Sequence, residues 1–202
     1  TFPRYRNFIK PNTWKETGEN GGGLTYNLGA HVIDQAVQLF GMPEAVFADI
    51  ATLRTGGKVD DYFIIHLMKP ARMPEVKITL KASYLMCENE PRFVLHGTEG
   101  SYVKYGLDPQ EADLTKGMLP DTPHWGEEDE SQWGILHTET DGNVVRKPYP
   151  TLPGNYAAFY ENIYQHIRNG AVLQSDACGV LGVIRLIEAA WESSRTGNVI
   201  KL

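Results

Sequence analysis

The sequence predicts an α+β fold, with an open, mostly antiparallel β-sheet and helices packed on one of its faces. The middle of the chain is rich in β-forming residues separated by turn sequences, one helical segment precedes it, and two follow it. Strands and helices do not alternate in the regular way that a parallel sheet requires. Five to seven strands could bury one face under three helices, and we expect the 202 residues to form one domain, because no internal repeat or obvious linker is present.

The first predicted helix lies in the segment from Gly21 to Gly41, "GGGLTYNLGAHVIDQAVQLFG". Apolar residues occur there at helical spacing, namely Val32, Ile33, Ala36, Val37, Leu39 and Phe40. Gly41, followed by Pro43, predicts the end of the helix, because glycine favours a helix end and proline cannot continue a helix. Residues 1–16 predict the end of a strand that enters an irregular loop.

Strands and hairpins are predicted in five segments: 45–54, 60–69, 75–85, 92–106 and 134–150. The clearest strand is 75–85, "EVKITLKASYL", where apolar and polar residues alternate, so that one face of the strand is apolar and the other polar. The last two segments predict hairpins. In the second hairpin, Asp141-Gly142 supplies the positive φ that a two-residue turn requires.

The two predicted hairpins are joined by the acidic segment Gly106–Trp133. A connection of this length without clear periodicity predicts a functional loop or a mobile one. Residues 155–169 and 175–197 then predict two helices, and Ser175-Asp176 supplies an N-cap for the second.

The composition argues against several classes of function. The chain has 19 basic and 25 acidic residues, a net charge of −6 and no basic tract, so we expect no nucleic-acid partner. The longest apolar runs, such as Phe63–Met68, are too short to span a membrane. Cys87 and Cys178 are the two cysteines and have no metal-binding or redox spacing, so we expect no metal site and a reducing, cytoplasmic location.

Glycines ahead of a helix raise the question of a phosphate site. A dinucleotide-binding fingerprint needs a hydrophobic strand, the spacing G-x-G-x-x-G and then a helix. The segment "GENGGGLTYNLGAH" lacks the strand and does not have the spacing. Gly21–Gly23 therefore indicate a loop that takes positive φ or approaches another backbone closely. We do not expect this chain by itself to bind the pyrophosphate of a nicotinamide cofactor.

Asn27 and His31 are four residues apart, so they lie about one turn apart on the same side of the predicted helix. A helix N-terminus disfavours positive charge, which would make the His31 imidazole a suitable proton acceptor for a substrate hydroxyl. A structural interpretation also stands: Asn27 is the N-cap, and His31 is a polar residue that fills space beside Gly23 or Tyr26. The spacing alone does not decide between the two.

The segment from Gly21 to Gly41 closely resembles the first helix of the C-terminal domain in the glucose–fructose oxidoreductase, inositol dehydrogenase and MocA family, where the pattern is GGG-x-L-x-D-x-G-x-H-x-I-D. The segments "FPRYRNFIKPNTWKE", "GTEGSYVKYGLDPQEADL", "NYAAFYENIYQHIRNG" and "SDACGVLGVIRLIEAAWESSRTG" are similar to the same family, so the resemblance covers essentially the whole chain. "KYGLDPQE" and "LGAHVIDQAVQLFG" look most like the subgroup that contains NADP-dependent scyllo-inositol dehydrogenase.

This resemblance implies that the chain is the C-terminal, substrate-binding and dimerising domain of a longer oxidoreductase. Members of the family have an N-terminal Rossmann domain that binds NAD or NADP, so the cofactor would be bound mainly by a part of the protein that is absent from this chain. The expected partners are the protein's own Rossmann domain, a small polyol, and further copies of the chain in a homodimer or higher homo-oligomer formed through the open sheet. The family's catalytic lysine, in an E-K-P motif, has no counterpart here, because Lys69-Pro70 follows Met68 in a β segment.

Residue by residue, His31 matches the catalytic histidine of the family. Asn27 matches its paired acid, and here the sequence departs from the pattern, because an amide takes up no proton. Asn27 is therefore expected to orient the substrate. Arg4, Tyr5 and Trp14 are expected at the rim of the pocket, and surface packing near a chain end is the alternative for all three.

The sequence thus predicts hydride transfer by the full-length protein between a nicotinamide and a hydroxyl-bearing carbon of a sugar or cyclitol. His31 would remove or return the hydroxyl proton, and this chain alone is not expected to be active. Two alternatives stay open, a non-catalytic sensor of sugar and cofactor and a stand-alone dimerisation module of the same fold. The residues that would choose between NAD and NADP lie outside the chain.

Overall fold

A computed structural model describes residues 1–18 and 21–202 of the chain. These residues fold into two compact units, one made of residues 1–90 and 175–202 and the other of residues 91–174. The described residues contain nine strands and four α-helices, in two open sheets. The predicted α+β class is confirmed, although the strands form two sheets where the sequence suggested one.

The first unit contains a five-stranded sheet with the order β1-β4-β3-β2-β9. Its strands are β1 (Phe2–Pro3), β2 (Pro43–Ala51), β3 (Tyr62–Pro70), β4 (Ile78–Ser83) and β9 (Ile200–Lys201). Neighbouring strands are antiparallel except β1 and β4, which are parallel. Phe47 is paired with His66, and His66 with Thr79, so these three residues form a row across one face of the sheet.

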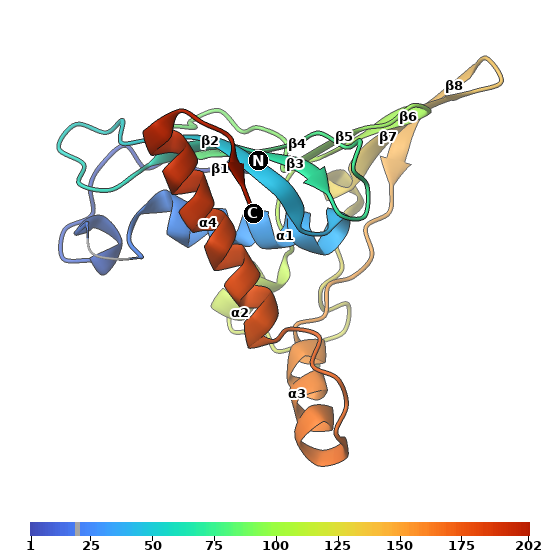
Figure 1. The fold of residues 1–202 in the computed structure, drawn as a ribbon. Coiled ribbons are helices and arrows are strands. Elements are labelled where there is room, and N and C mark those ends of the chain that lie inside the picture. The colour runs from blue at the N-terminus through green and yellow to red at the C-terminus, as the bar shows by residue number, and fades with distance from the viewer. Residues whose placement is uncertain (19–20) are drawn as a thin grey trace. The chain divides into compact units, whose positions relative to one another are not determined.

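Two helices, α1 (Ala30–Phe40) and α4 (Ala177–Thr196), cover the other face of this sheet (Figure 1). The alternation predicted for β4 is confirmed, because Ile78 and Leu80 are buried and Thr79 is exposed. Fully buried apolar side chains come from both layers: Leu24, Ile33, Val46, Phe63, Ile65, Leu186 and Ile187. Burial of a side chain of this size stabilises the fold by about 1.5–3 kcal/mol.

The ends of α1 and α4 agree with the sequence. The Asp176 carboxylate accepts a hydrogen bond from the Gly179 N–H at 2.8 Å and so caps the start of α4. Gly41 and Gly197 follow the last residues of α1 and α4, and both take positive φ, at 83° and 69°. Glycine adopts this conformation without the steric cost that other residues pay.

The second unit contains a four-stranded antiparallel sheet with the order β5-β6-β7-β8. Its strands are β5 (Phe93–His96), β6 (Gly100–Lys104), β7 (Gly134–Thr140) and β8 (Asn143–Tyr149). Both predicted hairpins are confirmed. In the second, Asp141 and Gly142 take φ values of 52° and 74°, as the two-residue turn demands.

The segment Gly106–Trp133 folds around the fully buried side chain of Gln110. It contains α2 (Gln110–Thr115) and the 3-10 turn η3 (Glu130–Gln132). The Gln110 Oε1 accepts a hydrogen bond from the Trp125 indole N–H at 2.8 Å, and Glu128 forms an ion pair with Lys104 at 2.6 Å. Sequence periodicity missed α2 because a helix of six residues is too short to show a repeat.

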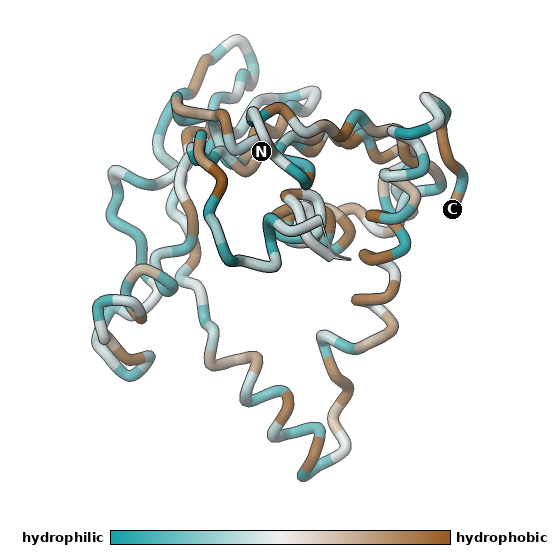
Figure 2. The backbone as a smooth tube through the Cα atoms, turned by 90° about the vertical axis from the view of Figure 1, so that its left-hand side faces the viewer, coloured by the Kyte–Doolittle hydropathy of each residue, from teal (hydrophilic) through white to brown (hydrophobic). Residues whose placement is uncertain are grey.

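Helix α3 (Ala157–Asn169) is amphipathic but buries none of its side chains. Figure 2 shows hydrophobic and hydrophilic residues alternating along it, at the lower end of the trace. The predicted apolar face, which includes Phe159 and Ile167, is therefore present but exposed. None of the helices in the described part of the chain has both the length and the apolar content needed to cross a bilayer.

Candidate functional site

The helix that carries Asn27 and His31 begins at Gly23 and continues through a π-helical segment, η2 (Thr25–Gly29), into α1. Asp60 anchors this start, because its Oδ2 accepts hydrogen bonds from the Thr25 N–H and from the Thr25 hydroxyl, both at 2.6 Å. Gly23 has a φ of 88°, and a Cβ atom there would lie 1.8 Å from the Asp60 Oδ1. The expectation of positive φ and close approach is confirmed at Gly23, where the close contact is with a side chain.

Asp60 also bears on the question of a phosphate site. Backbone N–H groups at a helix start bind phosphates well, but here a carboxylate already accepts the hydrogen bond of the Thr25 N–H. Burial of this carboxyl raises the pKa of Asp60 above its ordinary value, and the hydrogen bonds from Thr25 oppose that shift. A phosphate at the same place would meet another negative charge. The residues at this helix start therefore do not fit the pyrophosphate of a nicotinamide cofactor.

The structure corrects one detail of each interpretation of Asn27 and His31, the structural one and the functional one. Asn27 lies inside η2 and is not the N-cap, because the helix begins earlier, at Gly23. His31 lies in α1, more than one turn from the helix start, where the dipole has little effect. The helix dipole therefore gives no reason to assign proton acceptance to His31.

Asn27 is nevertheless a junction of polar groups. The Lys15 Nζ donates a hydrogen bond to its Oδ1 at 3.1 Å, and its Nδ2 donates to the Tyr84 hydroxyl at 3.4 Å. The imidazole of His31, one turn further along the helix, is exposed and has no hydrogen-bond partner among the described residues. It is thus available to a ligand on the same side of the helix as Asn27.

The N-terminal segment runs beside the end of β4. The Arg6 N–H donates to the Tyr84 carbonyl at 2.6 Å, the Met86 N–H donates to the Arg4 carbonyl at 3.2 Å, and Tyr5 forms an isolated bridge with Leu85. The side chains of Arg4 and Tyr5 are exposed. The structure thus brings the backbone at Arg4 and Tyr5 next to Tyr84, and a role for their side chains in binding stays a prediction.

Trp14 lies in the 3-10 turn η1 (Trp14–Glu16) and is 56% exposed. The Lys15 Nζ is 5.6 Å from the centre of its ring, a cation–π distance. The same ammonium binds Asn27, although no direct contact joins Trp14 to Asn27 or His31 in the described part of the chain. A place for Trp14 at the rim of the substrate pocket stays a prediction.

A buried ion cluster holds η1 in place. Arg54 pairs with Glu16 at 2.8 Å and with Asp61 at 2.9 Å, and the side chains of all three are at most 5% exposed. The Arg54 guanidinium also lies 4.8 Å from the centre of the Tyr84 ring. Glu16 and Asp61 are thereby committed to Arg54.

Sequence reasoning missed three residues of this site: Lys15, Tyr84 and Arg6. Lys15 adjoins Trp14 in the sequence, but nothing in a lone lysine signals a contact with Asn27. Tyr84 is 57 residues from Asn27, and only the tertiary fold brings them together. Arg6, whose guanidinium lies 5.1 Å from the centre of the Tyr84 ring, is placed by the same pairing.

Residues 1–202 match the model of one protein family, described as the oxidoreductase family, C-terminal alpha/beta domain. The chain belongs to this oxidoreductase family. The match covers all of the chain, including the helix with Asn27 and His31 and the N-terminal segment beside Tyr84.

Curated relatives of this oxidoreductase-family chain include the scyllo-inositol 2-dehydrogenase (NADP(+)) IolW of Bacillus subtilis, which is 35% identical over 202 residues. An uncharacterized oxidoreductase of Schizosaccharomyces pombe is 37% identical over 216 residues. Both alignments cover 100% of this chain, and the chain spans 54–58% of the length of the curated relatives it matches.

Solved structures that are similar to this chain are also described as oxidoreductases. A putative oxidoreductase from Bacteroides fragilis is 60% identical, with a TM-score of 0.89, and the alignment covers 100% of this chain and 56% of that one. The putative oxidoreductase YvaA from Bacillus subtilis is 34% identical, with a TM-score of 0.90 and the same coverage.

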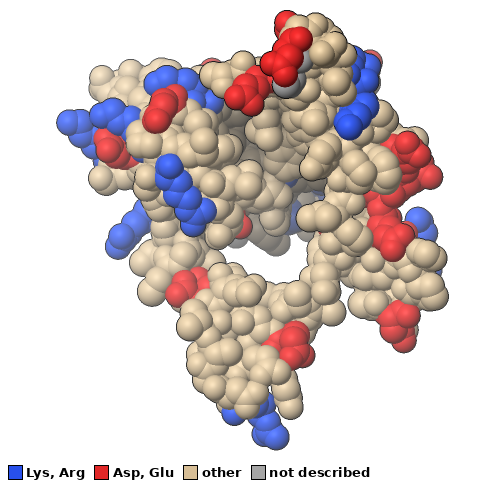
Figure 3. Space-filling view, turned by 90° about the vertical axis from the view of Figure 1, so that its right-hand side faces the viewer, with Lys and Arg blue, Asp and Glu red and all other residues tan. Residues whose placement is uncertain are grey.

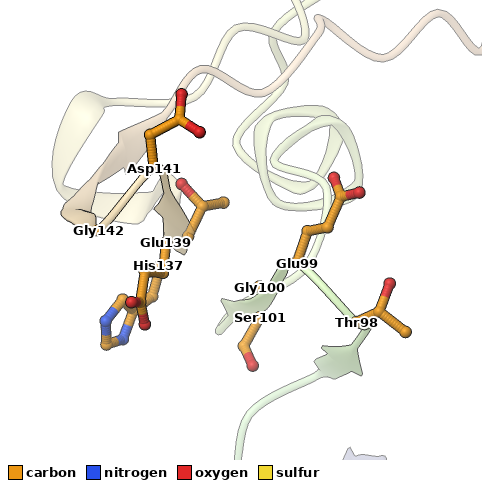
Figure 4. A pocket seen from close by; sticks show the side chains of 9 residues that line it. Thr98, Glu99, Gly100, Ser101, His137, Glu139, Asp141 and Gly142 are labelled. Atoms are coloured by element: carbon orange, nitrogen blue, oxygen red, sulfur yellow. The ribbon is translucent and has the colours of Figure 1, made fainter.

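The second unit of this oxidoreductase-family chain has an open polar depression between the start of β6 and the β7–β8 hairpin (Figure 4). The carboxylates of Glu99 and Asp141 point to one side there, and the imidazole of His137 points to the other. Within residues 1–18 and 21–202 no group of His, Cys, Asp and Glu is arranged to hold a metal ion. Among the described residues this depression therefore offers no arrangement that could hold a metal ion.

Proposed function

We propose that the full-length protein containing this chain is a nicotinamide-dependent oxidoreductase that acts on a hydroxyl-bearing carbon of a sugar or cyclitol. The chain would supply the wall of the substrate pocket. His31 would take up the hydroxyl proton during oxidation and return it during reduction, while Asn27 orients the substrate. The hydride would pass to or from an NAD or NADP molecule bound by the remainder of the full-length protein.

The observation that carries this proposal is the exposed imidazole of His31 beside the Asn27 junction, in a chain that belongs to an oxidoreductase family throughout its length. A relative that shares 35% of the residues is a dehydrogenase named for scyllo-inositol and NADP. The π-helical segment before His31 gives further support, because such segments are frequent at functional sites.

His31→Ala tests this role. In the full-length protein we expect turnover of polyols to fall by about 100-fold or more, as the loss of an acid–base group usually causes. His96→Ala is the matched control, because His96 is an exposed histidine of the second unit whose Nδ1 contacts the Ser101 hydroxyl at 2.8 Å. Steady-state kinetics on a panel of polyols with NAD and NADP would measure the effect, and unchanged turnover in His31→Ala would remove His31 from the mechanism.

The sensor alternative also has an observation in its favour. Both polar atoms of the Asn27 amide are engaged by Lys15 and Tyr84, and an amide cannot carry a proton away from His31. A sensor would bind sugar and cofactor without turnover in the wild-type protein. The same polyol panel, read by calorimetry as well as by kinetics, separates the two functions.

We further propose that full-length copies pair through the sheet of the first unit. The face opposite α1 and α4 carries the row of Phe47, His66 and Thr79, and these residues are partly or fully exposed. The Phe47 and His66 rings are stacked with centroids 6.3 Å apart, which gives this face a flat aromatic element. Two such faces related by a two-fold axis would form an isologous interface.

A further inference from the structure

Two cationic side chains lie at Asn27 and Tyr84, although the chain as a whole has a net charge of −6 and carries charged side chains of both signs on the face drawn in Figure 3. The first fifteen residues contain four cationic side chains and no acidic one. Two of these cations, Lys15 and Arg6, lie in the candidate site. Lys15 donates to the Asn27 amide, and Arg6 lies over the Tyr84 ring, to whose hydroxyl Asn27 donates.

The acidic side chains nearby do not neutralise these two cations. Glu16 and Asp61 are buried against Arg54, and Asp60 accepts the hydrogen bonds of Thr25. Neither Lys15 nor Arg6 belongs to any ion pair within the described residues. The acceptor that Lys15 does have is a neutral amide oxygen, which contributes no opposite charge.

We propose that the substrate of this site is an anionic polyol, a sugar acid or a sugar phosphate, and that Lys15 binds its anionic group. This inference rests on the proposed function and names the substrate class of the same site. The reacting hydroxyl would lie against His31, and the carboxylate or phosphate would lie about one helical turn away, at the Lys15 ammonium. Arg6 adds positive charge on the Tyr84 side, and the exposed Trp14 ring next to Lys15 offers a flat apolar surface to the sugar carbons.

Three features of the site favour an anion over a neutral polyol. A hydrogen bond between ammonium and carboxylate or phosphate is stronger than one between neutral groups. Lys15 is already positioned by Asn27 and Trp14, so its ordering costs little when the ligand binds. An anion would also supply the charge that no described carboxylate supplies to Lys15 and Arg6.

The test uses the full-length protein and three sugars that differ at one carbon: glucose, glucuronate and glucose 6-phosphate. We expect kcat/KM, or affinity measured by calorimetry, to be at least about tenfold higher for one of the two anions than for glucose. The preference should shrink as salt is added, because counterions screen the ammonium. A preference for glucuronate would identify the anionic group as a carboxylate, and a preference for glucose 6-phosphate would identify it as a phosphate.

Lys15→Met should reduce the ratio of anionic to neutral kcat/KM by about tenfold, and Lys15→Arg, which keeps the charge, should retain most of the ratio. Lys10→Met is the matched control, because Lys10 is an exposed cation of the same segment with no contact to Asn27 or Tyr84 among the described residues. A merely structural role of Lys15 would change both substrates alike and leave the ratio where it was. KM for the cofactor, measured in parallel, must stay constant if the anionic group belongs to the sugar.

The outcomes separate this inference from the proposed function. In one outcome, glucose is turned over as fast as both anions and His31→Ala loses activity. That result would overturn the inference of an anionic substrate but would leave the proposed oxidoreductase function in place. If no sugar is turned over, the calorimetric preference still decides: tighter binding of an anion that Lys15→Met abolishes supports the inference, and its absence overturns it. A change in cofactor KM alone in Lys15→Met would assign the positive charge to the cofactor and overturn the inference as well.

Discussion

Gly23 and Asp60 show how one pair of residues fixes the start of the site helix. The glycine leaves the space that the Asp60 carboxylate occupies, and that carboxylate binds the first turn through Thr25. The sequence foretold positive φ in the glycine triplet, since glycine is the residue that adopts it without strain. It did not foretell Asp60 as the partner, because nothing local links positions 37 residues apart.

Gly23→Ala should destabilise the first unit more than Gly21→Ala does. Both glycines have positive φ, at 88° and 83°, so both substitutions carry a similar backbone strain of about 1 kcal/mol. A Cβ at Gly23 would meet the Asp60 carboxylate at 1.8 Å, whereas at Gly21 no described atom lies within 4 Å. We expect an additional loss of about 1–3 kcal/mol for Gly23→Ala, measured by urea denaturation. Equal losses in the two variants would show that the Asp60 contact is unimportant.

A second group of residues near the site consists of buried charges that depend on one another. It contains Arg54, Glu16 and Asp61. Removal of one partner from such a group leaves an uncompensated buried charge, which commonly costs 3–5 kcal/mol. No sequence pattern predicted this cluster, because Glu16 is 38 residues from Arg54 and only the tertiary fold brings them together. It matters for the site because it fixes the turn that carries Trp14 and Lys15.

At the scale of elements, the sequence predicted best where a residue type has one physical use. Gly41 ends its helix as expected, and Asp141-Gly142 forms the expected hairpin turn. The alternation of β4 located its buried face correctly. What failed were short or irregular elements: α2 has too few residues for a periodic signal, and the helix start at Gly23 depends on Asp60 from elsewhere in the chain.

The helix start should also respond to pH. Burial raises the pKa of Asp60 above 3.8, so the folded protein takes up this proton more readily than the unfolded chain does. The stability that Asp60 contributes is therefore fully present at a pH below the pKa of Asp60 in the unfolded chain. It is lost as the pH rises through the pKa of Asp60 in the folded protein. Asp60→Asn keeps an oxygen acceptor for Thr25 but cannot ionise.

As the pH rises above about 4, the free energy of unfolding of Asp60→Asn should increase relative to that of the wild type. Urea denaturation at a series of pH values would measure this difference. Asp34→Asn controls for the loss of one negative charge, since Asp34 is exposed on α1, away from the proposed interface. If the two variants show the same pH dependence, burial of Asp60 is not its cause.

At the scale of the whole molecule, the family and the fold class could be recognised from sequence, because the motif around His31 and the strand-rich middle are both local features. The surface through which copies of the chain pair could not be predicted from the sequence in the same way. Whether one face of a sheet meets solvent or a second copy depends on side chains that are only partly buried, as Phe47, Ile64 and His66 are. Their alternation predicts a partly exposed face and does not name what covers it.

Ile64→Asp should convert a dimer of the full-length protein into a monomer, because it places a charge in the middle of the proposed isologous interface, where each copy would contribute it. Light scattering after gel filtration would report the mass. Leu39→Asp is the control, since Leu39 is 56% exposed on α1, on the side of the sheet away from the proposed interface. A dimer that survives Ile64→Asp would place the interface on another surface.

The π-helical segment Thr25–Gly29 makes the site sensitive to the length of its own backbone. A π-helical turn holds one more residue than an α-helical turn, so loss of any one residue there would leave an ordinary α-helix with an intact core face after Ala30. With Leu28 or Gly29 deleted, Asn27 would lie three residues before His31 in place of four, and both spacings keep the two residues on one side of an α-helix. Such a deletion would therefore alter the contacts of Asn27 with Lys15 and Tyr84, although fold and composition would be almost unchanged.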